Sequence, residues 1–167
     1  RFAQHLLPVA LGGMMSSRLF VEVREQLGLA DDIATTSESN PDTGYLVTTA
    51  GVKNDSVEKA IYVILREYKK LKSAGISKTE LTKVKEYEKG KMALELESSN
   101  AKASFYGMQE LLRGEMLTPA QLYDKIYKVT PKHIQAVARD IFQPERLNLV
   151  VLGPHRDNAR FLKLLKV

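Results

Sequence analysis

The helical periodicity of residues 55–74 constrains the fold of this chain most strongly. Apolar residues recur there every three or four positions, which places them in one stripe along a helix. Asp55 and Glu58 resemble a capping box at the start, and Gly75 ends the pattern. We therefore predict a long helix that buries this stripe against another layer of the domain. The stripe consists of Val57, Ala60, Ile61, Ile64, Leu65, Tyr68 and Leu71.

Signals for further helices occupy most of the remaining chain. Ser77 and Glu80 form a second capping-box pattern. Thr118 and Thr130 are each followed by proline, which places a capping residue before a proline at the first helical position. Before residue 55 two more amphipathic helices are expected, and Pro8 requires the first of them to be short or kinked. The expected helices are 2–11, 17–27, 77–97, 101–113, 119–128, 131–142 and 157–165. The helix at 17–27 should bury Leu19, Phe20, Val23 and Leu27.

Three segments have the pattern of β-strands. Residues 31–38 and 45–52 contain alternating or β-branched residues, and the turn-forming sequence Asn-Pro-Asp-Thr-Gly at 40–44 joins them into a hairpin. Residues 147–152 are an apolar run closed by Gly-Pro, which is typical of a buried strand. The order of elements predicts an α+β domain, in which helices cover one face of a largely antiparallel sheet.

Residues 11–31 combine a glycine pair, Ser16 as a helix cap, an amphipathic helix and Gly28 as its end. The stretch resembles the pattern Leu-Gly-Gly-Gly-Met-Ser-Ser-Arg-Leu-Phe-x-Glu-x-Arg-Glu-x-x-Gly-Leu-Ala-Tyr, which is common in zinc metallopeptidases of the pitrilysin, insulinase and mitochondrial processing peptidase type. This chain departs from it at two positions, with Met14 in place of the third glycine and Asp31 in place of the tyrosine. The flanking segments agree with the family layout, so the resemblance covers essentially all 167 residues.

The resemblance implies that residues 1–167 are one domain, a C-terminal-type fragment of a processing-peptidase-like protein. The chain begins at Arg1, inside an expected helix, and the family's domain has further strands before that point. We therefore expect the first strands of the sheet to be absent. Because an open sheet edge recruits other chains, we also expect self-association into a homo-oligomer or an artificial edge contact.

The catalytic signature of this family is absent from the sequence. It is His-x-x-Glu-His on a helix, where two histidines one turn apart bind zinc and the glutamate activates water. The histidines of this chain, His5, His133 and His155, lie far apart, and none has a partner at that spacing. We predict no metal, no cofactor and no catalytic residue in this chain. The resemblance places the zinc in a partner, a zinc-bearing N-terminal domain or subunit of the same family.

Three residues are candidates for peptide binding. In this family an arginine and a tyrosine near the motif contact the substrate or the developing oxyanion, and the resemblance matches them with Arg24 and Asp31. An ionised aspartate only accepts hydrogen bonds and repels an oxyanion, whereas a phenol donates one. Arg18 is the third candidate. The alternative for both arginines is a structural ion pair, for Arg24 with Asp31 or Asp32.

Composition excludes several classes of function. The chain is 44% hydrophobic and 27% charged, as soluble globular proteins are, and no apolar run approaches the length of a membrane span. Glutamates are mixed with the lysines of residues 67–91, so the net charge of +5 indicates solvated helix faces and no nucleic-acid site. The N-terminus lacks the pattern of a signal peptide. The absence of cysteine leaves the compartment open, with the cytoplasm as our expectation.

Two hypotheses about function remain. In the first, the chain is a non-catalytic domain that binds peptides or unfolded protein segments and closes the chamber of a zinc-dependent metalloendopeptidase. It should then be inactive alone. In the second, it is a catalytically inactive scaffold or assembly subunit with the same fold, which the change to Asp31 favours. A basic binding module, the third alternative, would need a clustered positive face. Substrate and cleavage preference stay open.

Overall fold

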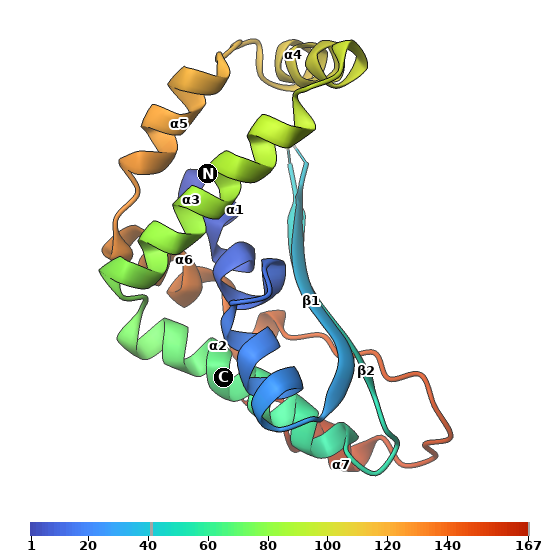
Figure 1. The fold of residues 1–167 in the computed structure, drawn as a ribbon. Helices are drawn as coiled ribbons and strands as arrows, with labels where there is room; N and C mark the ends of the chain where they lie inside the picture. Colours follow the sequence, from blue (N-terminus) through green and yellow to red (C-terminus); the bar gives the residue numbers. More distant parts are fainter. Residues whose placement is uncertain (41, 167) are drawn as a thin grey trace.

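The computed structural model describes residues 1–40 and 42–166. Helices lie along one side of an antiparallel hairpin of two strands (Figure 1). This arrangement confirms the predicted α+β class. The elements are α1 (Phe2–Pro8), η1 (Val9–Gly13), η2 (Phe20–Gln26), β1 (Ala30–Ser39), β2 (Gly44–Val52), α2 (Val57–Ala74), α3 (Lys78–Glu95), α4 (Ser99–Arg113), α5 (Pro119–Tyr127), α6 (Pro131–Ile141), η3 (Pro144–Arg146) and α7 (Ala159–Leu162).

The inner face of the hairpin carries a small polar network into the core. Thr35 of β1 and Thr48 of β2 are paired across the strands, with their hydroxyl oxygens 2.8 Å apart. The Tyr68 hydroxyl of α2 lies 2.6 Å from the Thr48 hydroxyl, and its ring stacks on Phe142 with centroids 4.4 Å apart. Burial raises the pKa of Tyr68 to about 12. These contacts join the sheet to the helical layer, because buried hydroxyl groups need hydrogen-bond partners.

Gly12 lets η1 approach β1 more closely than any other residue would. A Cβ atom built on Gly12 would lie 2.4 Å from the Thr35 Oγ1 atom and 2.7 Å from the Thr35 backbone nitrogen. Gly13 has no such contact, because its Cβ would stay 3.4 Å from the nearest atom, in Val9. The first glycine of the pair is therefore required by packing, and the second is not.

The first two expected helices form with changes at their ends. Pro8 lies at the end of α1, and the chain continues as η1, of wider π type, because proline lacks the N–H that a regular helix needs there. The expected helix 17–27 is present as η2, and Leu19, just before it, and Val23 within it are both completely buried. Two expectations here were wrong. Ser16 is not its cap, and Leu27 is 37% exposed because Gly28, with φ of 56°, turns the chain away from the inner face.

Some of the predicted helix caps are present and others are not. Thr118 and Thr130 each cap a helix that begins with proline, as expected, and each also completes a capping box with the residue three positions on. The predicted capping box at Asp55 and Glu58 was wrong, since α2 begins after Ser56 without a side-chain cap. Glu58 instead lies 3.3 Å from the guanidinium of Arg160 in α7. Glu58 therefore forms a tertiary ion pair and does not cap the start of α2 as the local sequence pattern had predicted.

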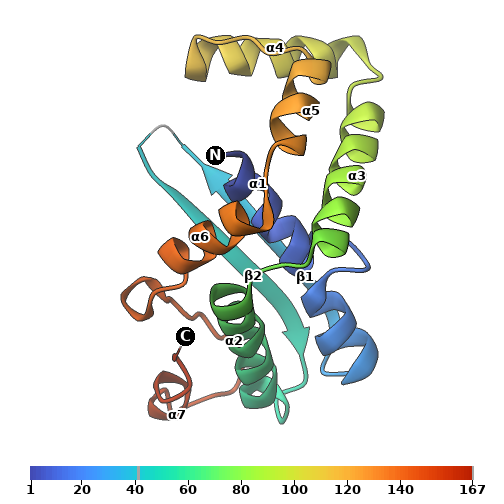
Figure 2. The same ribbon diagram turned by 90° about the vertical axis from the view of Figure 1, so that its left-hand side faces the viewer.

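α3 and α5 both lead to α4, which lies at the top of the molecule in both views (Figures 1 and 2). Lys85 of α3 ties α5 down, because its ammonium group donates to the carbonyl oxygens of Tyr127 and Val129, at 2.9 and 2.6 Å. A lysine at this place also complements the negative end of the α5 dipole. Among the described residues, no helix combines the length and the apolar composition needed to cross a membrane.

The predicted buried strand at 147–152 was wrong. Within the described residues this segment is extended but joins no sheet, and Val150 and Leu152 are 93% and 101% exposed. The intervening residues are partly buried against the core: Leu147, Leu149 and Val151. Side chains of the segment thus alternate between the core and solvent, as in a strand, but no neighbouring strand pairs with its described backbone. Strand pairing requires a neighbouring backbone, and over residues 1–40 and 42–166 β2 is paired with β1 alone. Pro41 of the predicted turn lies outside the described residues; across that turn the Asn40 N–H donates to the Thr43 carbonyl oxygen over 2.8 Å.

Candidate functional site

The motif segment passes from η1 through η2 into the start of β1. Gly12 fixes its first part against the sheet, as described above. At its other end the Leu29 N–H donates to the Val23 carbonyl oxygen over 2.8 Å, which folds the beginning of β1 back onto the last turn of η2. The segment is thus held at both ends. Its polar side chains project from a fixed backbone toward α2 and α3 or toward solvent.

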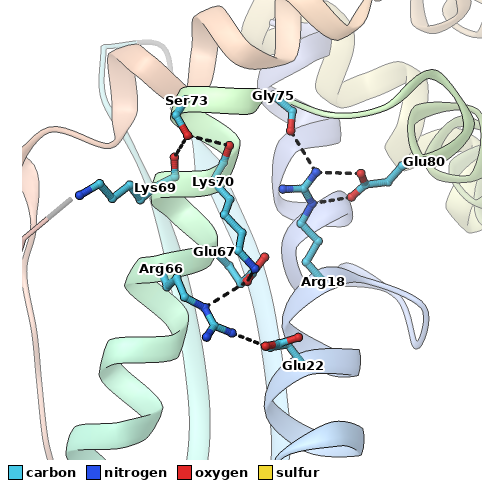
Figure 3. A network of polar contacts seen from close by, with 9 residues as sticks. All are labelled: Arg18, Glu22, Arg66, Glu67, Lys69, Lys70, Ser73, Gly75 and Glu80. Carbon is cyan, nitrogen blue, oxygen red and sulfur yellow. Dashed lines mark hydrogen bonds and ion pairs between the residues drawn. The ribbon is translucent and has the colours of Figure 1, made fainter.

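Arg18 lies between η2 and the first turn of α3 (Figure 3). Its Nε atom donates to Glu80 Oε1 over 2.6 Å, and its Nη2 atom donates to Glu80 Oε2 over 2.8 Å and to the Gly75 carbonyl oxygen over 3.0 Å. Burial alone would lower the pKa of Arg18, but the hydrogen bonds and charge of Glu80, with the charge of Glu67, raise it. This is the structural ion pair that was the alternative to peptide binding for Arg18.

A second group of charges lies beside this pair (Figure 3). Arg66 of α2 donates to Glu22 of η2, and its Nε atom lies 3.7 Å from a carboxylate oxygen of Glu67. The Lys70 ammonium group donates to the same Glu67 oxygen over 2.6 Å. Glu67 is only 4% exposed, so these two cations compensate a carboxylate that burial would otherwise destabilise. The network ties the motif segment to α2.

An open cleft of about 580 Å³ lies over these contacts. The motif segment lines one side, with Ser16, Ser17 and Glu22, and the start of α3 lines another, with Ser77 and Lys83. The Ser17 hydroxyl is buried and has no hydrogen-bond partner among the described residues. The cleft holds as many glutamates as basic side chains along its walls, and most of these are already paired with one another. It favours no strongly charged ligand of either sign.

Arg24 differs from Arg18 in being free. It is exposed on the last part of η2, with its guanidinium 4.8 Å from the centre of the Phe20 ring. Within the described residues it forms no ion pair, with Asp31 and Asp32 included. The structural alternative proposed for Arg24 is therefore absent here. A cation stacked on an aromatic ring keeps its N–H donors available for a ligand.

Asp31 is the unpaired residue of a β-bulge. Ala30 pairs with Val52 and Asp32 pairs with Gly51, so Asp31 has no partner in β2. It is exposed, and its carboxylate makes no hydrogen bond or ion pair with the described residues. A bulge redirects side chains and is common beside functional sites. The position of the family tyrosine thus lies on the surface.

Each of the three histidines has a different contact in the fold. The Nε2 atom of His5 lies 2.5 Å from Glu88 Oε2, His133 completes the capping box of α6, and His155 contacts Arg160. Over residues 1–40 and 42–166, no three His, Cys, Asp or Glu side chains gather as a metal site would require. The residues present do not fit a zinc ion.

Sequence reasoning missed Glu67 and the tertiary role of Glu80. Glu67 lies four residues from both Val63 and Leu71 on the buried side of α2, and a glutamate at a buried helical position signals an internal ion pair. Glu80 was assigned to a capping box. Its N–H does donate to the Ser77 hydroxyl over 3.1 Å, but its carboxylate binds Arg18 instead of returning to the helix start. No local signal in the sequence identifies that partner.

The chain is similar to a group of zinc proteases. An uncharacterized zinc protease of Streptomyces coelicolor is 34% identical over 157 residues, which are 94% of this chain and 34% of that protein. An uncharacterized zinc protease of Bacillus subtilis is 35% identical over 86% of this chain and 35% of its own length. The mitochondrial-processing peptidase subunit beta of Saccharomyces cerevisiae is 29% identical over 87% of this chain and 32% of its own. The chain thus spans about a third of the length of these relatives.

Solved structures and a family model agree with these relatives. A conserved protein from Enterococcus faecalis superposes with a TM-score of 0.73 and 26% identity, over 83% of this chain and 32% of that chain. The peptidase M16 inactive domain from Pseudomonas fluorescens superposes with a TM-score of 0.72 at 18% identity, over 83% of this chain and 33% of that chain, which shows the shared fold. The model of the peptidase M16 inactive domain matches residues 1–87. The chain therefore belongs to the peptidase M16 family, as a domain of its inactive, C-terminal type.

Proposed function

We propose that this chain is the non-catalytic domain of a zinc-dependent metalloendopeptidase, which closes a chamber over the zinc-bearing domain and helps to bind peptides or unfolded segments. The observation that carries the proposal is the exposed pair of Arg24 and Asp31, two motif positions that the fold leaves without carboxylate or cationic partners. By contrast, the motif residues Gly12, Arg18 and Glu22 are used for packing and for internal ion pairs. Unused polar groups on a fixed surface are what a ligand requires.

Peptide binding in extended form fits the open side of the hairpin. β1 is the strand that packs against η1 and η2, whereas Tyr45 and Val47 of β2 are 57% and 38% exposed. An extended peptide can pair with an exposed strand edge, which supplies main-chain hydrogen bonds for any sequence. Arg24 of η2, which packs against β1, would add a separate contact to a carbonyl or carboxylate oxygen of the peptide, away from the β2 edge.

Hydrolysis belongs to the partner in this proposal. The relatives that the chain resembles are zinc proteases, and a zinc ion in such an enzyme activates a water molecule for attack on the peptide bond. The zinc-bearing domain or subunit, the peptide substrate and a location in the cytoplasm are all parts of the proposal. The chain alone contributes binding and orientation of the peptide.

Peptide cleavage by the full-length protein tests this function. Arg24→Ala should raise KM for a peptide substrate about tenfold with little change in kcat, since one charge-assisted contact contributes on the order of 1.4 kcal/mol. Arg156→Ala removes another exposed arginine and serves as the matched control. The isolated 167 residues should show no activity. Chelator-sensitive hydrolysis by this chain alone, or equal KM values for the two variants, would reject the proposal.

Asp31 favours a second candidate function, a scaffold or assembly subunit that keeps the fold without assisting proteolysis. A carboxylate at this position cannot donate a hydrogen bond to an oxyanion. The change Asp31→Tyr in the full-length protein separates the two functions, with Asp32→Tyr as control. A gain in peptide turnover with the first change alone supports the peptidase function. Turnover that is absent in both variants and in the unchanged protein supports the scaffold.

A further inference from the structure

Two open clefts adjoin beside the motif segment. The cleft over the Arg18–Glu80 pair, described above, is called the polar cleft. The second, of about 450 Å³, is called the apolar cleft, and its lining is Met14, Met15, Ser16, Lys83, Glu86 and Tyr87. Ser16 and Lys83 line both clefts, so the two meet at these residues. One ligand can therefore contact a polar and an apolar surface at the same time.

One row of side chains on α3 runs along both clefts. Thr79, Lys83 and Tyr87 stand at positions i, i+4 and i+8 of the helix, and they line the polar cleft, both clefts and the apolar cleft in that order. The motif segment contributes Met15, which is 74% exposed, to the apolar cleft. Because methionine adapts its shape and tyrosine has a large apolar ring, this end of the row suits an apolar side chain.

The polar cleft contains one basic side chain without a carboxylate partner. Three cations and three glutamates line it, but one of the glutamates is bound by Arg66, which is not part of the lining. The ion pairs are Arg18–Glu80, Lys70–Glu67 and Arg66–Glu22. Lys83 is the cation left over, since it forms no ion pair with the described residues. Glu86 of the apolar cleft already accepts a hydrogen bond from the Tyr127 hydroxyl.

Two further features favour a negative group beside Lys83. Ser77 caps α3, so the positive end of the α3 dipole lies in the wall of the polar cleft. Ser17, in the same wall, is only 1% exposed, and its hydroxyl has no partner within the described part of the chain. A buried hydroxyl is stabilised when a ligand supplies the missing hydrogen bond. A single carboxylate fits these groups, whereas a more highly charged anion would be repelled by the paired glutamates.

We propose that the joined clefts bind the C-terminal end of a peptide whose last residue is apolar. The carboxylate lies beside Lys83 and the start of α3, and the last side chain lies against Met15 and Tyr87. This goes beyond the proposed function, in which Arg24 and the edge of β2 bind the peptide chain, because it adds a site for a peptide end. Hydrolysis of a peptide bond creates one such carboxylate for each bond cleaved, so the site would take the products of proteolysis.

Fluorescence anisotropy with the full-length protein tests the carboxylate contact. The probe is a hexapeptide ending in leucine, labelled with fluorescein at its N-terminus, as the free acid and as the C-terminal amide. Excess chelator removes zinc, so neither cleavage nor a metal–carboxylate contact contributes. The acid should bind about fivefold more tightly than the amide, as expected for one exposed ion pair. Lys83→Gln should abolish this difference, and Lys132→Gln, at an exposed lysine in the first turn of α6, should preserve it.

A second variant tests the apolar half of the site. Met15→Ser, at an exposed position, should weaken binding of the leucine-ending acid about fivefold, because apolar contact area is lost. A glycine-ending acid should bind the variant and the unchanged protein equally. Octanoate and N-acetyl-leucine are then compared as competitors of the probe. Stronger competition by octanoate would identify a lipid carboxylate as the ligand and reject the peptide end.

The remaining outcomes also overturn the proposal. They are equal affinity for acid and amide, equal effects of Lys83→Gln and Lys132→Gln, and no binding of any probe. Binding that depends on Met15 but not on the carboxylate would identify a general apolar surface instead. These measurements require no catalysis. A failure of the Arg24→Ala test therefore concerns the proposed function alone and leaves the anisotropy result to be judged separately.

Discussion

Arg18 and Glu80 form a two-pronged ion pair, with donor–acceptor distances of 2.6 and 2.8 Å, between residues that are 62 positions apart in the chain. The same guanidinium donates to the Gly75 carbonyl oxygen just before α3 begins. One side chain of the motif segment thus holds the junction of α2 and α3 against η2. The two partners are only about a fifth to a quarter exposed, so solvent screens their attraction incompletely.

Arg18→Met should destabilise the chain by about 2–3 kcal/mol, because it removes charge-assisted hydrogen bonds and leaves Glu80 without its partner. Urea denaturation measures the free energy of unfolding. Arg156→Met, at an exposed arginine, should change it by less than about 0.5 kcal/mol. In a double-mutant cycle with Glu80→Gln, the double variant should lose less stability than the sum of the losses in the two single variants. Strict additivity would show that the pair is not coupled.

Gly12→Ala should cost about 2–4 kcal/mol, since the new Cβ would meet backbone and side-chain atoms of Thr35 that cannot move without opening the sheet. Gly13→Ala is the matched control and should change stability by less than about 1 kcal/mol. Thermal unfolding of both variants gives the comparison. Thr35→Ala should not rescue Gly12→Ala, because the Thr35 backbone nitrogen, 2.7 Å from the Cβ, remains. Similar losses for the two glycines would contradict this packing.

Tyr68→Phe should alter the dependence of stability on high pH. The folded pKa of Tyr68 is about 12, above its ordinary value of 10.0, so the folded state keeps the proton that the unfolded state loses. The resulting stabilisation is complete below pH 10 and is lost as pH rises to about 12. It amounts to about 2–3 kcal/mol in wild type and is missing in the variant. Urea titrations at several pH values should show the steeper decline in wild type. Parallel curves would mean that Tyr68 ionises as freely in the folded state as in the unfolded state.

The extended segment at 147–152 should promote self-association of the isolated chain. Val150 and Leu152 are almost completely exposed there, beside backbone that no described strand pairs. Sedimentation at increasing concentration should show dimers or larger species, and Val150→Lys with Leu152→Lys should shift them toward monomer. Leu162→Lys, at another exposed leucine, should leave the distribution unchanged. A monodisperse monomer at all concentrations would refute the expectation.

The helices could be predicted because their signals are local. The stripe of α2 follows from a period of 3.6 residues, and the capping boxes of α5 and α6 need only a threonine, a proline and a residue three positions on. The hairpin is almost as local, with one turn between its strands. The prediction of a strand at 147–152 was wrong because strand formation is not a local property. The sequence of this segment has the composition of a strand, but a strand exists only where another backbone accepts its hydrogen bonds.

The candidate site shows the same division. The sequence of residues 11–31 by itself determined the family, the loop-helix-strand order and the departure at Asp31. Only the tertiary structure decided that Arg18 is held by Glu80, that Arg24 stays free and that Asp31 stands unpaired on a bulge. Two arginines six positions apart have the same local chemistry. Which of them meets a carboxylate depends on where the first turn of α3 lies relative to residue 18, and that contact between distant segments leaves no pattern in the sequence around either residue.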